Sequence, residues 1–173
     1  PIDWASQQES FLSDPSFQNP FPPAPALVPM TRIACNVEAL VSLGDAPTGE
    51  RRYVPLSGGV VQGPELNGRI LSGGVDWQVG RRDGVLEIAA HYVIETEDGA
   101  RVEVQSTGLR HGPPEVMVRL AAGEPVDASE YFFRTLVKFT TGHPAWLHLN
   151  KVMAIARGQR QARRVLLDLY RLT

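Results

Sequence analysis

The chain of 173 residues is long enough to bury one hydrophobic core and fits a single domain. Its 43% hydrophobic and 21% charged residues are ordinary for a globular protein. The net charge of −2 gives no reason to expect nucleic acid or an acidic membrane as a partner. No apolar run approaches the roughly 20 residues of a membrane-spanning helix. Cys35 is the only cysteine, so no intrachain disulfide can form, and we expect a reducing, cytoplasmic location.

Residues 1–30 predict a proline-rich N-terminal arm that precedes the folded domain. Four prolines between positions 20 and 25 exclude a regular helix or a central strand there. Such a segment is typical of a disordered or extended tail. It also carries apolar side chains that a purely solvating tail would not need, namely Trp4, Phe11, Phe17, Phe21 and Leu27. We expect the arm to be ordered, with a short helix over residues 3–12, and to help form a homodimer.

Residues 31–173 are predicted to form one antiparallel β domain. From Ile33 to Val41 the odd positions are apolar, while Asn36 and Glu38 fall on the other face, as in a half-buried strand. A proline-to-glycine segment over residues 112–123 predicts a helix of two to three turns. Further strands are expected over residues 52–56, 85–96, 100–106, 131–141, 146–156 and 165–172.

The glycine-rich stretch of residues 51–78 organises the predicted sheet. Gly58-Gly59 and Gly73-Gly74 indicate tight corners between short strands, and Asp-Gly pairs further on indicate hairpins. About eight to ten strands, one short helix and no βαβ repeat predict an all-β fold, either a sandwich or a barrel. We expect a single antiparallel β-barrel, because closure removes the sheet edges, and such a barrel can hold a small ligand in one mouth.

Asp76 is the leading candidate for an acid or a base. In the run Asp76-Trp77-Gln78, the carboxylate and the amide face one side of a strand and the indole faces the other. A carboxylate inside a barrel should have a raised pKa, which suits proton transfer near neutral pH. The structural alternative is an acceptor that fixes the backbone of the preceding glycines.

A second candidate group lies on the expected strand 146–156. Trp146, His148 and Asn150 share one face at a spacing of two, where they can supply a stacking surface, a proton shuttle and an oxyanion donor. The alternative is an exposed histidine, or one satisfied within the core.

Two arginines and a tyrosine complete the predicted pocket. Arg134 lies in an aromatic strand and needs an acceptor, which is Asp76, Glu115 or a ligand anion. Arg110 precedes the short helix and is expected at a barrel mouth. Tyr92 is expected on an apolar pocket wall.

Familiar catalytic and metal motifs are absent from the sequence. There is no GxSxG, P-loop, GxGxxG after a strand, or CxxC. The histidines lack metal-ligand spacing, so we expect neither a metal nor a cofactor. One cluster of basic residues is expected to be a solvated hairpin tip: Lys151, Arg157, Arg160, Arg163, Arg164 and Arg171.

Five segments together carry a resemblance: GERRYVPLSGG, GPELNGRILSGGVDWQ, TEDGA, GLRHGPPEVMVRLAAGE and YFFRT. Over roughly residues 32–172 the chain resembles the domain of unknown function 3237 family. The resemblance implies a calycin-like antiparallel β-barrel and little about chemistry. Some members are associated with secondary-metabolite pathways, where cofactor-free cyclisation or isomerisation would be in keeping. His91 and His148 depart from the family pattern, which has Arg and Trp at these places.

We therefore expect a cofactor-independent acid/base enzyme, of the isomerase, cyclase or hydratase/lyase type. It would act on a small aromatic or polyketide-like metabolite in the barrel mouth. The predicted catalytic residues are Asp76 and His148, and the predicted substrate-binding residues are Trp77, Tyr92, Arg110, Arg134, Trp146 and Asn150. The alternatives are a non-catalytic lipocalin-like carrier and, ranked last, a scaffold protein with a solid barrel.

Overall fold

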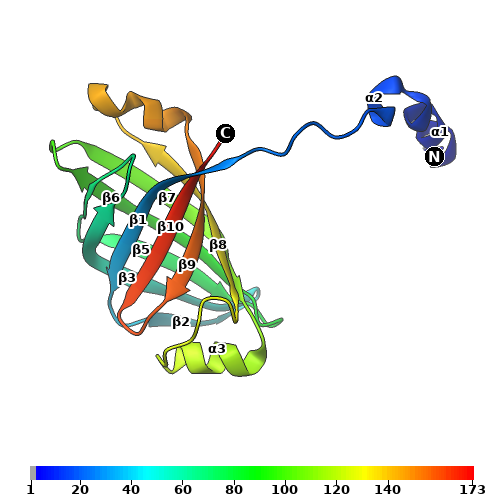
Figure 1. Ribbon diagram of the computed structural model, residues 1–173. Helices are drawn as coiled ribbons and strands as arrows, with labels where there is room; N and C mark the ends of the chain where they lie inside the picture. The colour runs from blue at the N-terminus through cyan, green and yellow to red at the C-terminus, as the bar shows by residue number, and fades with distance from the viewer. Residues whose placement is uncertain (1–2) are drawn as a thin grey trace.

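A computed structural model describes residues 3–173 and shows a closed antiparallel β-barrel (Figure 1). The elements are α1 (Trp4–Ser13), α2 (Pro15–Gln18), β1 (Leu27–Val37), β2 (Val41–Ala46), β3 (Gly49–Gln62), β4 (Gly68–Ile70), β5 (Gly74–Gly80), β6 (Leu86–Thr96), β7 (Arg101–His111), α3 (Pro114–Ala121), β8 (Phe132–Thr140), η1 (Pro144–Lys151), β9 (Met153–Arg160) and β10 (Arg164–Leu172). The all-β barrel with a short helix and a separate N-terminal arm is the predicted fold.

The barrel closes because β1 pairs with two strands, β10 on one side and β3 on the other. Between them the order is β10-β9-β8-β7-β6, and β4 and β5 share the place between β6 and β3. In the described chain β2 pairs with β3 alone. The result is an eight-strand barrel with two extra strands. The Asp-Gly turns join β5 to β6 and β6 to β7 as predicted, with Gly84 and Gly99 at φ +86° and +80°.

The two halves of the barrel interior are filled differently. Figure 1 shows η1 at one end of the barrel and α3 at the other. Leu149 of η1 is 1% exposed and belongs to the same core cluster as Ile94, Val102 and Val104, which are fully buried. Large apolar side chains therefore fill the η1 half. In the half near α3, a cavity remains whose lining combines apolar side chains with several polar ones.

The predicted strand over residues 146–156 is wrong in its first half. Residues 144–151 form the 3-10 helix η1, and β9 begins only at Met153. Pro144 favours this turn, since proline suits the first helical position and cannot donate to a strand ladder. The side chain of Asn150 accepts from the N–H of Thr141 at 3.0 Å and donates to its carbonyl at 2.9 Å, which ties the helix to the end of β8.

Gly58-Gly59 is not the predicted corner. Both glycines lie inside β3, which pairs with β5 as far as Leu56 and with β4 from Gly59 onward. The register against β1 shifts beside them. A Cβ atom at Gly59 would lie 2.2 Å from the carbonyl oxygen of Ala34, so the two backbones approach too closely for a side chain. Gly73-Gly74 does form the predicted corner, with Gly73 at φ +98°.

The N-terminal arm contains α1 and α2, which stand away from the barrel (Figure 1). Trp4 is 73% exposed and Phe21 is 100% exposed. The side chains of Phe11 and Phe17, also singled out in the sequence, lie outside the described residues. The β domain begins at Leu27, before the predicted start, because Leu27 and Val28 already pair with β10. Pro29 falls at a register shift, where its missing N–H is tolerated.

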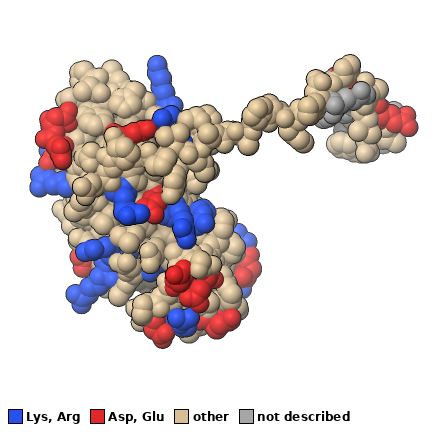
Figure 2. Space-filling view, in the orientation of Figure 1, with Lys and Arg blue, Asp and Glu red and all other residues tan. Residues whose placement is uncertain are grey.

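The surface shows no concentration of one charge on the face drawn in Figure 2, where acidic and basic side chains are interspersed. Within residues 3–173 no helix is both long enough and apolar enough to span a bilayer.

Replacement of Gly59 tests the close approach of β1 and β3. The Gly59→Ala variant should lose about 1–3 kcal/mol of unfolding free energy, because φ of +152° is strained for alanine and Ala34 cannot move aside. Urea unfolding measures the loss. Gly142→Ala is the matched control, since nothing lies within 4 Å of its added Cβ. Equal stability of the two variants would contradict the close approach of β1 and β3 at Gly59.

For the arm, we propose that a second copy of the chain covers Trp4 and Phe21. Aromatic side chains bury about 150–250 Å² each on docking. Deletion of residues 1–24 should therefore convert a dimer to a monomer in light scattering and lower the melting temperature. The double variant Trp4→Ala, Phe21→Ala should do the same with the chain length kept. An unchanged mass and melting temperature would show that the arm serves neither assembly nor stability.

Candidate functional site

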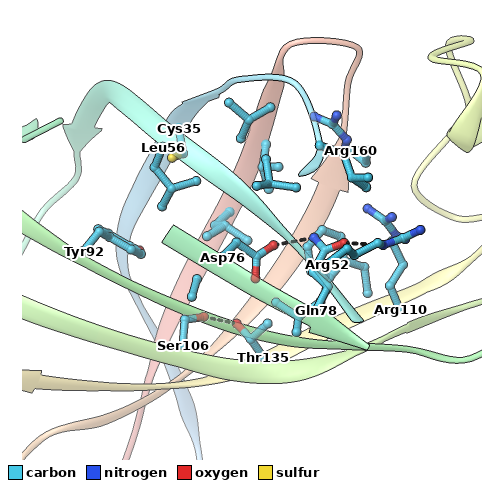
Figure 3. Close-up of a pocket in the computed structure, with 18 of the residues that line it drawn as sticks. Cys35, Arg52, Leu56, Asp76, Gln78, Tyr92, Ser106, Arg110, Thr135 and Arg160 are labelled. Carbon is cyan, nitrogen blue, oxygen red and sulfur yellow. Dashed lines mark hydrogen bonds between the residues drawn. The ribbon is translucent and has the colours of Figure 1, made fainter. Parts of the chain in front are cut away.

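A cavity of about 390 Å³ occupies the α3 half of the barrel (Figure 3). Leu120 and Ala121 of α3 form part of its wall, and Glu38 and Leu40, which follow β1, also line it. Most of the lining is apolar. The polar side chains that line it are Glu38, Arg52, Asp76, Gln78, Tyr92, Ser106, Arg110, Thr135 and Arg160.

Asp76 is held in the cavity by a chain of hydrogen bonds. Gln78 Nε2 donates to Asp76 Oδ2 at 2.6 Å, and Arg52 Nε donates to Gln78 Oε1 at 3.2 Å. Arg52 in turn pairs with Glu50 at 3.0 Å. The strands position these groups. Gln78 lies two residues after Asp76 on β5, on the same face, and pairs with Arg52 of the neighbouring strand β3. Because Arg52 occupies the amide oxygen, the amide NH2 is directed at the carboxyl group.

Burial raises the pKa of Asp76 from 3.8 to about 6. The hydrogen bond from Gln78 and the positive charge of Arg110 act in the opposite direction and favour the carboxylate. The raised pKa places the proton equilibrium of Asp76 close to neutral pH. This is the environment that the sequence predicted for Asp76.

Three polar atoms of the cavity lack a hydrogen-bond partner. In the described chain, the buried side-chain atoms without a partner are Asp76 Oδ1, Tyr92 Oη, Arg110 Nε and His143 Nδ1. The first three belong to cavity-lining residues on the adjacent strands β5, β6 and β7. An unpaired buried polar atom costs about 1–3 kcal/mol. Such a cluster is therefore suited to a polar ligand that supplies the missing partners.

Arginines make one side of the cavity positive. Burial, and next the neighbouring charge of Arg160, lower the pKa of Arg110 to about 10, so it stays protonated at neutral pH. The Arg110 guanidinium lies 5.7 Å from the centroid of the Phe133 ring. Burial also lowers the pKa of Arg160, against which the charges of Asp76 and then Tyr131 act.

Asp76, Tyr92 and Arg110 all line the cavity, as we expected from the sequence. Burial raises the pKa of Tyr92, so its phenol is neutral at physiological pH and can donate a hydrogen bond. Trp77 points out of the barrel instead, since neighbours on a strand face opposite sides, and its ring lies 5.1 Å from that of Tyr53.

Arg134 also lies on the outer face of the barrel. It sits 5.3 Å from the centroid of the Phe132 ring, and its Nη1 donates to the Phe133 carbonyl at 2.8 Å. The acceptor is thus neither Asp76 nor Glu115, the acidic partners considered from the sequence.

Trp146, His148 and Asn150 do not line the cavity, because they belong to η1 at the other end of the barrel. Trp146 Nε1 donates to the carboxylate of Asp98, at 3.0 Å from Oδ2. His148 is exposed, with its ring 5.9 Å from that of Trp146. Strand periodicity had placed these three on one wall, and it does not apply to a helical turn.

Sequence reasoning missed Arg52, Gln78 and Arg160. Gln78 was recognised as sharing a face with Asp76 but was given no role. Arg160 was assigned to a solvated tip, yet it is half-buried on the cavity wall. The strand pattern contained the information. Ala154, Ala156 and Gly158 are small residues at every second position on the inward face of β9, and Arg160 is the next residue on that face.

Metal chemistry has no obvious site in the described chain. No group of three or more His, Cys, Asp or Glu side chains there is placed to hold a metal ion. Cys35 lines the cavity, but burial raises the pKa of its thiol to about 12, which disfavours the reactive thiolate.

The family described as "Protein of unknown function (DUF3237)" has a model that matches residues 25–172. The chain belongs to this family. A "UPF0311 protein" of Rhodopseudomonas palustris (strain TIE-1) is 39% identical over 138 residues, which cover 80% of this chain and 90% of the relative. The family assignment inferred from the sequence is thereby confirmed, and the arm lies almost entirely outside the matched region.

Solved structures of similar chains share the barrel. The conserved protein RPA1785 of Rhodopseudomonas palustris superposes with a TM-score of 0.85 at 36% identity and covers 88% of this chain and 100% of its own. A "beta-barrel like protein" of Acinetobacter baumannii AYE gives 0.77 at 35% identity, with 90% and 100% coverage. A chain described as "an enzyme from Penicillium herquei" gives 0.69 at 19% identity, with 90% and 99% coverage, and this likeness shows the fold alone.

The buried Asp76 carboxyl should make stability depend on pH. Its pKa is higher in the folded chain (about 6) than the ordinary 3.8, so the folded state holds the proton more tightly. The free energy of unfolding should therefore fall as pH rises between these values, by about 1.4 kcal/mol per pH unit at most. Asp76→Asn should remove this fall and be about 1–3 kcal/mol more stable than the wild type above pH 6.

Denaturant unfolding at several pH values measures this effect. Asp83→Asn is the control, because the Asp83 pKa is lowered by its hydrogen bond from Arg81, and its replacement should bring no gain above neutral pH. If Asp76→Asn is less stable than the wild type at every pH, Asp76 serves structure through its ionised form.

Proposed function

We propose that this DUF3237 protein is a cofactor-independent acid/base enzyme acting on a small aromatic or polyketide-like molecule in the barrel cavity. The observation that carries the proposal is Asp76, a carboxyl with a pKa of about 6 whose Oδ1 has no protein partner. A general base or acid works best when its pKa lies near the working pH. Isomerisation, cyclisation and water addition or loss all need such a proton carrier.

The neighbours of Asp76 fit this role. Gln78 holds one carboxyl oxygen, which leaves Oδ1 without a partner and available to a ligand. In the proposed reaction Asp76 removes a proton from a carbon next to a carbonyl group, and the electron pair moves onto the carbonyl oxygen. The neutral Tyr92 hydroxyl then stabilises the developing oxyanion as a hydrogen-bond donor. Return of the proton to another atom completes an isomerisation without an oxidant or a reductant.

The barrel is shared with the Penicillium herquei chain, which is described as an enzyme. A lipocalin-like carrier is the second candidate function, because the mostly apolar cavity wall favours retention of an aromatic ligand without any reaction. A carrier catalyses no reaction, so a rate that depends on pH would distinguish the enzyme from the carrier.

The proton-transfer role of Asp76 can be tested without the natural substrate, by using 5-nitrobenzisoxazole. When a base takes the ring C–H proton of this probe, its N–O bond breaks and a coloured phenolate forms. The protein should accelerate this opening, with a rate that rises with pH and levels off above about 6. Asp76→Asn should lower the rate at least about tenfold.

His148→Ala is the matched control, because His148 is exposed and lies outside the cavity. Its rate should equal that of the wild type. If activity is kept in Asp76→Asn and lost in His148→Ala, the proton is transferred by His148 of η1 and not by Asp76. Tight binding of the probe without any acceleration would favour the carrier.

A further inference from the structure

Two guanidinium groups in the cavity lack an acidic partner. In the described chain Arg110 and Arg160 form no ion pair, whereas Arg52 is paired with Glu50. Among the described residues the Arg110 side chain has no hydrogen-bond partner. The Arg160 side chain donates from Nη1 to the backbone carbonyl of Arg164, at 3.4 Å. Burial of unpaired cations is costly. The charge of Asp76 favours the protonated form of both arginines, but one carboxylate balances only one of the two positive charges.

The charge balance of the cavity indicates how much is missing. At neutral pH Asp76 contributes one negative charge, and Arg110 and Arg160 contribute two positive charges. Glu38 lies on the rim but is exposed, so solvent screens its charge. The interior is therefore short of a single negative charge.

The charged and apolar groups lie at different ends of the cavity. Figure 3 shows Arg110 and Arg160 to one side of Asp76, with Tyr92, Leu56 and Cys35 to the other. A ligand that fits both ends has an anionic head next to the arginines and an apolar body beyond Asp76. Its middle then lies against Asp76 Oδ1.

We propose that the substrate is a small aromatic monocarboxylic acid, whose carboxylate lies between Arg110 and Arg160 and whose ring system extends past Asp76. This inference rests on the proposed function in taking the cavity as the substrate site. Planar guanidinium groups bind carboxylates through paired hydrogen bonds, so the head group matches in geometry as well as in charge. A phosphate would bring a second negative charge close to Asp76, which the charge balance disfavours.

The test compares 2-naphthoate with 2-naphthamide, its neutral isostere, by isothermal titration calorimetry at neutral pH. The wild type should bind the carboxylate at least about tenfold more tightly than the amide, which is the order expected for hydrogen bonds to a charged group. Equal affinities for the two probes would overturn the proposal, whatever the variants do.

The variants Arg110→Met and Arg160→Met keep the aliphatic stem and remove the charge. Each should bring the preference for 2-naphthoate close to one, while amide binding changes little. Arg134→Met is the matched control, because Arg134 stacks on an aromatic ring in the same way but lies outside the barrel. Its preference should stay at the wild-type value. A preference that survives in both cavity variants would place the carboxylate elsewhere and refute the inference.

Asp76→Asn separates this inference from the proposed function. The variant should keep or strengthen 2-naphthoate binding, because it removes a nearby negative charge, while turnover of 5-nitrobenzisoxazole is lost. If the wild type opens 5-nitrobenzisoxazole but does not prefer the carboxylate, the proposed substrate class is wrong and the proposed enzymatic function stands. Carboxylate preference without turnover in the wild type would refute the enzyme and indicate a carrier of organic acids.

Discussion

The structure depends on the closure of the sheet through β1, which pairs with β10 on one side and β3 on the other. Closure satisfies the backbone of both strands and removes the open edges that a flat sheet would expose. It also gives every strand an inner face, so each second residue is committed to the interior. Gly59 permits this closure because only a residue without a side chain fits where β3 passes Ala34.

The interior formed in this way is used for two purposes. In the η1 half, Ile94, Val102 and Leu149 are buried with almost no exposure, and burial of such side chains stabilises the fold. In the α3 half the same inward positions hold Asp76 and Arg110, which gain nothing from burial alone. Burial in the η1 half thus offsets the destabilisation from the polar groups that line the cavity.

Buried groups with a shifted pKa or without a hydrogen-bond partner are concentrated at functional sites. A buried carboxyl with a raised pKa and unpaired polar atoms lowers the stability of the free protein. The Glu50-Arg52-Gln78 chain holds Asp76 in one orientation, which would be unnecessary for a residue that merely filled space. A ligand with one negative charge would supply the partner that Arg110 and Arg160 lack within the described residues.

The sequence by itself determined the barrel, the two Asp-Gly hairpins, the short helix and the interior position of Asp76 and Tyr92. These depend on local rules, since strand periodicity and turn residues act over a few neighbouring positions. The tertiary structure alone decided that residues 144–151 form a plug rather than a strand, which moved His148 away from Asp76. It also decided that Arg160 faces the cavity. Both outcomes depend on which strands meet across the closed sheet, and such distant pairings leave little trace in any short stretch of sequence.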